Sequence, residues 1–250
     1  MNIFTDNGMI RHHECDAAGK VKLPVLLDYF QDAAAQHADI LQVGMNDISG
    51  GGFIWVLSRL KLQIDTMPAL GDRVEVITYP AGFSRIFADR QYLMRCNGTD
   101  AVRGTSEWLL INPVTGRPAN PAKSLPATLP KNEDMPRWFT DLDKLNCSGG
   151  TPCGAYTVGM GDVDLNRHLN NAVYSRWLID ALGNLRPGTI PLIKSVQINF
   201  LREGVPGHRI ELAGLWQDDG SFSLCGVWQE SGETAFQAEG NAAISPFETF

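Results

Sequence analysis

The chain has 250 residues, of which 44% are hydrophobic and 20% charged, and its net charge is −7. This composition suffices for a buried core and excludes disorder of the whole chain. An acidic chain lacks the basic face that nucleic-acid binding requires, so no nucleic-acid partner is expected. No apolar run approaches the ~18 residues of a membrane helix, and residues 1–13 contain no apolar stretch typical of a signal peptide. We therefore expect no membrane association and a cytoplasmic location.

Cysteines and short motifs exclude several further classes of protein. The cysteine count is odd and includes no C-x-x-C pair, so neither a zinc site nor a disulfide framework is expected. The positions are Cys15, Cys96, Cys147, Cys153 and Cys225. The sequence contains no G-x-S-x-G, H-E-x-x-H or P-loop motif. We expect no metal and no cofactor.

The first strong signal in chain order is an amphipathic helix, predicted over residues 24–41. Pro24 suits the first helical position, and apolar residues recur at helical spacing from Leu27 to Leu41. Alternating apolar residues then predict four strands, with an Asn97-Gly98 turn between the last two. Their ranges are 55–64, 73–79, 85–96 and 101–112.

The same order returns after residue 154. A second helix is predicted over 171–182, with Asn170 as its N-cap, followed by strands over 192–200, 209–216, 221–230 and 235–244. This internal repeat predicts an N-terminal repeat of residues 1–112, a proline-containing linker over 113–154 and a C-terminal repeat of residues 155–250. The N-terminal repeat has extra residues, which we place at Gly44–Phe53, with a flexible loop expected at Gly50-Gly51-Gly52.

One long helix followed by an antiparallel meander is the order of a hot-dog fold. The sheet wraps the apolar stripe of the helix, and two repeats together cover exposed sheet edges. We therefore predict an α+β protein with two hot-dog repeats, each a long helix wrapped by an antiparallel β-sheet.

A polar cluster precedes the second predicted helix. Asp164, Asn166 and His168 alternate there, so an extended loop would aim them to one side. Glu203 follows the strand at 192–200 and could approach the same place. The helix start near Asn170 gathers backbone N–H groups that suit an oxyanion. The alternative is turn and cap chemistry for the cluster, with Glu203 a solvated turn residue.

The N-terminal repeat helps to choose between these interpretations. Asp16 matches Asp164, but the other polar residues are not repeated. The unmatched pairs are Ala18 with Asn166, Lys20 with His168, and Met67 with Glu203. Residues needed only for a turn should occur in both copies, so the comparison favours a catalytic cluster in the second.

These motifs resemble those of the acyl-acyl-carrier-protein thioesterases of plants and bacteria, over nearly the whole chain. The matching segments are Asp164-x-Asn166-x-His168-Leu169-Asn170-Asn171-Ala172-x-Tyr174, Asn199-Phe200-x-Arg202-Glu203 and Trp55-Val56-Leu57-Ser58-Arg59, supported by 70–78 and 115–118. The resemblance implies a double hot-dog hydrolase that releases free fatty acid in fatty acid biosynthesis. It implies catalytic roles for Asp164, Asn166, His168 and Glu203. Some members place a cysteine after the glutamate, but Gly204 stands here, so a cysteine nucleophile at that position is excluded.

For the mechanism, we predict Glu203 as general base for water, with Asp164 sharing that role or attacking directly. His168 would polarise the carbonyl or orient the base, and Asn166 would position the carboxylate or the substrate. Backbone N–H groups near Asn170 would bind the oxyanion. The sequence does not separate general-base from covalent carboxylate chemistry.

We expect the acyl chain to contact Leu26, Phe30, Trp55 and Leu57 in the N-terminal repeat, with ordinary core packing as the alternative. The expected partner is acylated acyl carrier protein, bound through its phosphopantetheine arm, with Arg167 near the phosphate. A second candidate surface for this acidic carrier holds arginines on neighbouring strands, although ordinary solvated surface is the alternative. These are Arg85, Arg90, Arg95 and Arg103.

Two competing functions remain open at this stage, an acyl-CoA thioesterase of the hot-dog type and a non-catalytic acyl-binding hot-dog protein. Coenzyme A and acyl carrier protein present the same phosphopantetheine arm, so the motifs cannot separate these substrates. Homodimer formation also stays open.

Overall fold

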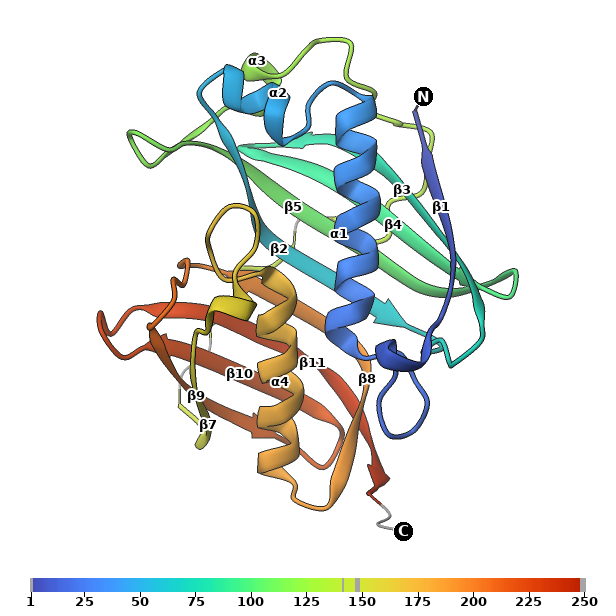
Figure 1. Ribbon diagram of the computed structural model, residues 1–250, viewed down its shortest axis with the longest axis vertical. Coiled ribbons are helices and arrows are strands. Elements are labelled where there is room, and N and C mark those ends of the chain that lie inside the picture. Colours follow the sequence, from blue (N-terminus) through green and yellow to red (C-terminus); the bar gives the residue numbers. More distant parts are fainter. Residues whose placement is uncertain (1, 141, 147–148, 248–250) are drawn as a thin grey trace. The chain divides into compact units, whose positions relative to one another are not determined.

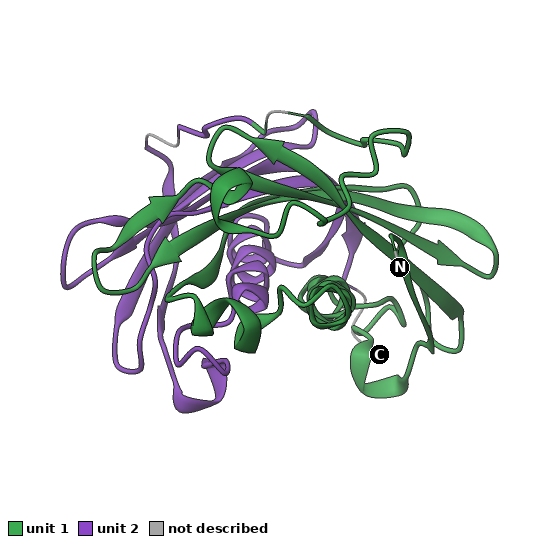
Figure 2. Cartoon of the chain, turned by 90° about the horizontal axis from the view of Figure 1, so that it is seen from above, with its two compact units in different colours: residues 1–142 green, residues 143–250 purple. Residues whose placement is uncertain are grey.

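The computed structural model describes residues 2–140, 142–146 and 149–247. The chain divides into two compact units, residues 1–142 and residues 143–250 (Figure 2). Each unit combines one long helix with a larger antiparallel sheet, so the protein is a mixed α/β structure with few helices (Figure 1). Cys147 lies outside the described residues.

Unit 1 contains the helix α1, Leu23–Ile40, where the sequence predicts a helix over 24–41. Its sheet has the order β1-β3-β4-β5-β2, with β6 paired to β5, and all these pairs are antiparallel. The strands are β1 (Phe4–Met9), β2 (Ile54–Ile64), β3 (Arg73–Ser84), β4 (Phe87–Cys96), β5 (Thr99–Asn112) and β6 (Arg117–Ala119). Two shorter helices are α2 (Met45–Gly50) and α3 (Pro121–Ser124).

Unit 2 contains α4, Asn171–Leu185, which extends three residues beyond the predicted end at 182. Its antiparallel sheet has the order β8-β11-β10-β9-β7. The strands are β7 (Thr151–Thr157), β8 (Thr189–Phe200), β9 (Arg209–Trp216), β10 (Ser221–Trp228) and β11 (Thr234–Pro246). A single turn of 3-10 helix precedes each long helix, at His12–Glu14 and at Met160–Asp162.

The long helices are held by apolar burial against their sheets. In α1, Leu26 and Phe30 are buried, and α1 packs on β3 and β1. In α4, Trp177 and Leu178 are buried, and α4 packs on β7, β8 and β9. Each fully buried large side chain contributes roughly 1.5–3 kcal/mol of transfer free energy. This burial fixes α4, and therefore the loop that precedes it, on the sheet of unit 2.

The regions between these elements contain further structure. In the segment Gly44–Phe53, α2 forms and its Ile48 packs with Val43, Leu110 and Leu125, while Gly51 and Gly52 follow in a turn. The segment 113–154, predicted as a linker, contains the short helix α3 and is divided between the two units. Residues 113–142 belong to unit 1, and residues 151–154 begin β7. Side chains of the unit 1 sheet bind the backbone of residues 113–142. For example, Glu107 Oε1 accepts from the N–H of Leu142 at 3.1 Å.

Candidate active site

The loop between Met160–Asp162 and α4 is organised by Asp164. Its Oδ1 accepts from the backbone N–H of Asn166 at 2.8 Å and of His168 at 3.4 Å. Its Oδ2 accepts from Asn166 Nδ2 at 3.4 Å. The loop is thus a tight turn around one carboxylate, and the side-chain amide of Asn166 is held against that carboxylate.

Glu203 meets this loop at His168. The distance from His168 Nε2 to Glu203 Oε2 is 3.2 Å, and the side chains are 35% and 50% exposed. The N–H of Leu169 donates to the carbonyl of Gly204 at 2.8 Å, which joins the two segments. The structure therefore brings together the four polar residues singled out by the sequence, as an aspartate–asparagine pair beside a histidine–glutamate pair.

The histidine–glutamate contact joins a ring nitrogen to a carboxylate oxygen. An ionised carboxylate can only accept hydrogen bonds, so a hydrogen bond in this contact requires the proton on Nε2 of His168. The ring can therefore orient the Glu203 carboxylate. Both side chains also reach solvent, which a reactant entering this site requires.

Most backbone N–H groups near Asn170 are already bonded within the protein. The N–H of Asn170 donates to Asp162 at 2.9 Å, and that of Val173 donates to the Asn170 carbonyl at 3.0 Å. The N–H of Ala172 donates to Oδ1 of Asn170 at 2.9 Å, so Asn170 is the N-cap of α4. These three groups are not presented to an oxyanion, contrary to the expectation from the sequence. The cap side chain of Asn170 is likewise occupied.

Unit 1 contains the same turn around Asp16. Its Oδ1 accepts from the N–H of Ala18 at 2.9 Å and of Lys20 at 2.9 Å, the positions that match Asn166 and His168. The N–H of Val21 donates to Pro68, just as that of Leu169 donates to Gly204. The aspartate is therefore a turn former in both units. What unit 2 adds is the set of Asn166, His168 and Glu203 side chains.

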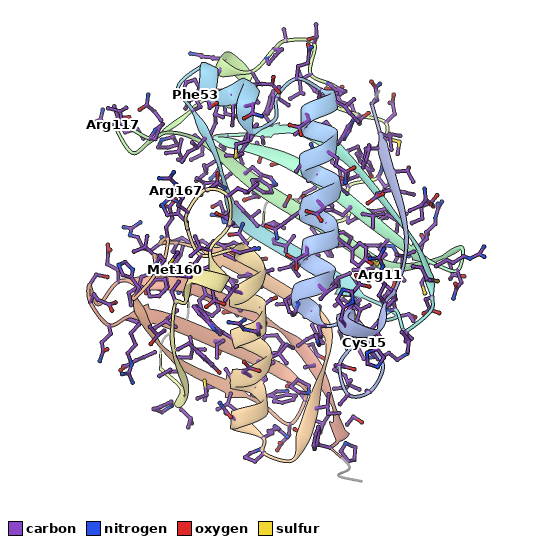
Figure 3. The ribbon with its side chains drawn as sticks, in the orientation of Figure 1. Arg11, Cys15, Phe53, Arg117, Met160 and Arg167 are labelled. Atoms are coloured by element: carbon purple, nitrogen blue, oxygen red, sulfur yellow. The ribbon has the colours of Figure 1, made fainter. Side chains whose placement is uncertain are left out.

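Arg167 lies at the tip of the loop before α4, and Met160 lies at its start (Figure 3). Arg167 is exposed and has a positive φ of 65°, where unit 1 has Gly19 with φ 71°. A non-glycine residue in this conformation is uncommon and costs conformational energy. Leu165 beside it is 87% exposed. The loop thus presents a cation and an apolar side chain to solvent.

Gly204 stands where the indole ring of Trp228 covers the backbone. A Cβ at this position would lie 2.5 Å from Cη2 of Trp228 and 3.3 Å from Cβ of Leu169. A distance of 2.5 Å between carbon atoms is a clash, so any larger side chain must displace the indole. This explains in physical terms why the chain has glycine rather than cysteine here.

We predict that Gly204→Ala lowers the free energy of unfolding by about 1–3 kcal/mol through overpacking against Trp228. Urea denaturation of both proteins would measure this. Gly183→Ala is the matched control, because nothing lies within 4 Å of a Cβ at that helical position. Since alanine favours a helix more than glycine does, the control should be neutral or stabilising. Equal stability of Gly204→Ala and the wild type would contradict the close packing.

The residues predicted to contact an acyl chain lie in unit 1. Leu26, Phe30 and Leu57 are buried, and the Phe30 ring stacks on Tyr92 with centroids 4.9 Å apart. Trp55 is half-buried and packs on the cluster of Val43, Ile48, Leu110 and Leu125. Its Nε1 donates to the Val43 carbonyl at 2.9 Å. A hollow of about 600 Å³ in unit 1 is lined by residues 2–3, 127 and 129–135, and by none of the four side chains predicted to contact an acyl chain.

The strand arginines of unit 1 do not form a free basic surface. Arg90 is buried, with Nη1 3.2 Å from Thr78 Oγ1 and 3.2 Å from His37 Nδ1. Arg95 pairs with Glu75 and Asp100, and Arg103 pairs with Asp65 and Asp100. Arg85 is exposed. Burial and pairing thus remove three of the four cations predicted to attract a carrier protein.

Within the described part of the chain, no group of three histidine, cysteine, aspartate or glutamate side chains is placed to hold a metal ion. Over the same residues, no helix has the length and apolar character needed to cross a membrane.

Comparison with known proteins decides the family. The sequence model of the acyl-ACP thioesterase N-terminal domain matches residues 1–128, and that of the acyl-ACP thioesterase C-terminal domain matches residues 152–240. The chain belongs to the acyl-ACP thioesterase family. The two matched ranges include the Asp164–His168 loop, Glu203 and the whole of α1.

Curated members of the acyl-ACP thioesterase family are similar to the chain over most of its length. It is 25% identical over 214 residues to the chloroplastic palmitoyl-acyl carrier protein thioesterase of Gossypium hirsutum, covering 80% of the chain and 50% of that relative. It is 28% identical over 208 residues to the chloroplastic oleoyl-acyl carrier protein thioesterase of Coriandrum sativum, covering 72% of the chain and 53% of that relative. The chain thus spans about half the length of these relatives.

Solved structures of the family share the fold. An acyl-ACP thioesterase from Bacteroides thetaiotaomicron superposes with a TM-score of 0.86 at 21% identity. The match covers 96% of the present chain and 98% of the Bacteroides chain. The 12:0-ACP thioesterase from Umbellularia californica superposes with a TM-score of 0.78 at 20% identity. The match covers 97% of the present chain and 98% of the Umbellularia chain. The hot-dog type of fold predicted from the sequence is therefore confirmed.

Proposed function

We propose that the chain hydrolyses the thioester of fatty acyl-acyl-carrier-protein and releases free fatty acid in fatty acid biosynthesis. The observation that carries this proposal is the contact of His168 Nε2 with Glu203 Oε2 at 3.2 Å, at the entrance to α4, in a chain of this family. The named activities of the palmitoyl- and oleoyl-specific relatives support the substrate class.

In the proposed reaction, Glu203 takes a proton from a water molecule while the water oxygen attacks the thioester carbonyl carbon. His168 orients the carboxylate through Nε2. The tetrahedral intermediate then collapses, the C–S bond breaks, and Glu203 returns the proton to the leaving sulfur. The products are a carboxylic acid and the free thiol of the carrier. A thiol has a pKa near ~8.5, so this leaving group needs little acid assistance.

The oxyanion must be stabilised by other donors than the bonded amides at the start of α4. Asn166 carries two N–H bonds on Nδ2, and Asp164 Oδ2 accepts one of them. We assign the second to the oxyanion, with Asp164 as the residue that aims it. This assignment favours water attack over direct attack by Asp164, because Asp164 Oδ1 already accepts from two backbone N–H groups.

We further propose that the two units are two hot-dog repeats, with catalysis confined to the second. The matched hydrogen bonds around Asp16 and Asp164 support this. So do the paired bonds from Val21 to Pro68 and from Leu169 to Gly204. We keep the four residues Leu26, Phe30, Trp55 and Leu57 of unit 1 as proposed contacts of the acyl chain.

The decisive test is thiol release from acyl thioesters, followed with a thiol-reactive dye, across chain lengths and on both carriers. A higher kcat/KM on acyl-acyl-carrier-protein than on acyl-coenzyme A supports the proposal. The reverse order favours an acyl-CoA thioesterase. Absence of thiol release on every substrate, with acyl thioester binding retained, would leave a non-catalytic acyl-binding protein.

Arg167 gives a prediction for carrier docking. Acyl carrier proteins are acidic, and Arg167 presents an exposed cation on the loop that bears His168. Arg167→Glu is therefore expected to raise KM for the carrier-bound substrate about 10-fold, while a small acyl thioester is hydrolysed as before. Raising the salt concentration should weaken carrier binding in the wild type more than in the variant.

The matched control for this prediction is Lys194→Glu, the same change of charge at an exposed position of β8. It should leave KM for the carrier-bound substrate unchanged. Equal effects of the two substitutions, or an equal KM change on both substrates, would remove the case for Arg167.

The proposed acyl contacts are tested by chain-length preference. Phe30→Leu shortens a buried side chain on α1 and should shift the preferred acyl chain, at about 1–3 kcal/mol of transition-state discrimination per methylene group. The readout is kcat/KM across a series of acyl thioesters. Val76→Ala, in the same buried core, should reduce stability without changing the preference. A Phe30→Leu variant that loses stability alone would identify Phe30 as ordinary core.

A further inference from the structure

The backbone on the N-terminal side of Glu203 is held by two buried side chains. The carbonyl of Arg202 accepts from Tyr174 Oη at 3.2 Å and from Trp228 Nε1 at 3.4 Å. On the other side, the carbonyl of Gly204 accepts from the N–H of Leu169 at 2.8 Å. Glu203 therefore lies between two fixed carbonyl groups, while its own carboxylate is half exposed.

Both donors are buried and packed against other side chains. Tyr174 is 3% exposed, and its ring makes edge contacts with Phe200 and Phe236, at centroid distances of 5.5 and 5.1 Å. Burial, and secondly the charge of Glu203, raises the pKa of Tyr174, so its hydroxyl stays protonated and able to donate. Trp228 is 3% exposed and covers Gly204. Tyr174 on α4 and Trp228 on β10 thus connect the core of unit 2 to the peptide before Glu203.

Matched hydrogen bonds identify the corresponding positions in unit 1. The N–H of Asn170 donates to Asp162 as that of Lys22 does to Glu14, which places Leu26 at the position of Tyr174. The N–H of Gln229 donates to Arg209 as that of Asn97 does to Arg73, which places Cys96 at the position of Trp228.

Neither matching side chain in unit 1 provides the same support. Leu26 has no donor, and Cys96 Sγ donates to Asp72 Oδ2 at 3.1 Å. Met67 stands in unit 1 at the position of Glu203. The two donors therefore occur in the unit that has the histidine–glutamate contact, and are replaced in the unit that lacks it. A role limited to folding would be expected in both units.

We propose that Tyr174 and Trp228 are positioning residues that hold Glu203 in contact with His168. This inference rests on the proposed thioesterase function. Loss of either donor lets the Arg202 peptide rotate, which moves the Glu203 carboxylate away from His168 Nε2 and from the attacking water. Small misplacements of a catalytic group carry large rate penalties, so the effect falls on kcat.

The experiment uses the full chain with Tyr174→Phe, Trp228→Phe and the double variant. Each substitution keeps an aromatic ring and removes one donor. Tyr156→Phe is the matched control, because Tyr156 stacks on Trp177 in the same aromatic cluster at 5.5 Å and is not in the proposed machinery. We expect kcat to fall about 10-fold in each single variant and about 10²-fold in the double variant. KM should stay within about 2-fold, and Tyr156→Phe should match the wild type.

A second readout separates positioning from general loosening of the fold. The ring nitrogen resonances of His168, measured by NMR with labelled histidine, report its contact with Glu203. In Tyr174→Phe they should move toward the values found in Glu203→Gln. Unchanged resonances, or kcat equal to that of the wild type, would overturn the positioning role. A wild-type protein that releases no thiol would instead overturn the proposed function, and the NMR comparison would still report the effect of the two donors on His168.

Discussion

Glu203→Gln is expected to lower kcat for acyl-thioester hydrolysis by about 10²–10⁴-fold. Glutamine keeps the size and an acceptor oxygen of glutamate, but it cannot take a proton from water. The contact with His168 Nε2 can persist, so the substrate should still bind and KM should change little. The same lower limit of ~10²-fold applies to His168→Ala, which removes the ring that orients the carboxylate.

The measurement is steady-state thiol release at saturating substrate, accompanied by thermal denaturation. Glu211→Gln is the matched control, since Glu211 is an exposed glutamate on β9 of the same unit. Neither variant should lose more than about 0.5 kcal/mol of stability, because both positions are exposed. Wild-type turnover in Glu203→Gln would assign Glu203 to the surface of a turn rather than to the chemistry.

The sequence predicts the long helices and the central strands because their signals come from burial. In α4, for example, Tyr174, Leu178 and Ala181 lie on the buried face at spacings of four and three residues. The same logic locates the polar cluster, because unlike residues at matched positions of a repeat, such as Met67 and Glu203, cannot be explained by shared turn geometry. The prediction that Glu203 could approach the same place rests on the order of the elements, and the structure has it in contact with His168.

The first strand of each sheet was missed because main-chain pairing, not side-chain burial, holds it. In β1, four of six residues are exposed, and the strand pairs with β3 from Phe4 to Met9. In β7, Pro152 and Gly154 suggest a turn, yet the strand pairs with β9 through a bulge between those residues. Period-two hydrophobicity does not mark such strands.

The role of Tyr174 and Trp228 could not be predicted in full from the sequence. Tyr174 stands in the motif that resembles the family, close to the Asp164–His168 loop, but its spacing on α4 also suits plain core packing. Trp228 ends an ordinary alternating strand. The two side chains reach their common acceptor, the Arg202 carbonyl, only when the helix, the strand and the loop are folded together. Two side chains that donate to the same backbone carbonyl need no particular residue types or hydrophobic periodicity, so the sequence does not reveal them.

The same limit applies to the oxyanion site. Sequence reasoning places backbone N–H groups at the start of a helix, but it does not reveal which of them are already bonded. Asn170 caps Ala172, and Asp164 binds the amides of Asn166 and His168. Amides at the start of α4 that were expected to bind the oxyanion are thus already bonded, and for this reason we propose a side-chain donor in their place.

Asp164→Asn, compared with Asp16→Asn, separates the turn role of this aspartate from a role in catalysis. In both variants the amide oxygen can still accept from the two backbone N–H groups of the turn, so stability should change by less than about 1 kcal/mol in each. In Asp164→Asn, however, the side chain of Asn166 loses the carboxylate oxygen that it donates to at 3.4 Å. The negative charge beside the site is lost as well.

We therefore expect Asp164→Asn to lower kcat at least ~10²-fold, whereas Asp16→Asn should remain close to the wild type, because Ala18 offers no side-chain donor to aim. Steady-state kinetics at saturating substrate and thermal denaturation of both variants provide the comparison. Asn166→Ala should lower kcat by a similar factor, and adding it to Asp164→Asn should cost little more, because the two side chains act as a unit. Equal, small losses in Asp164→Asn and Asp16→Asn would show that the aspartate only shapes the turn, and would leave Glu203 as the sole carboxylate of the proposed mechanism.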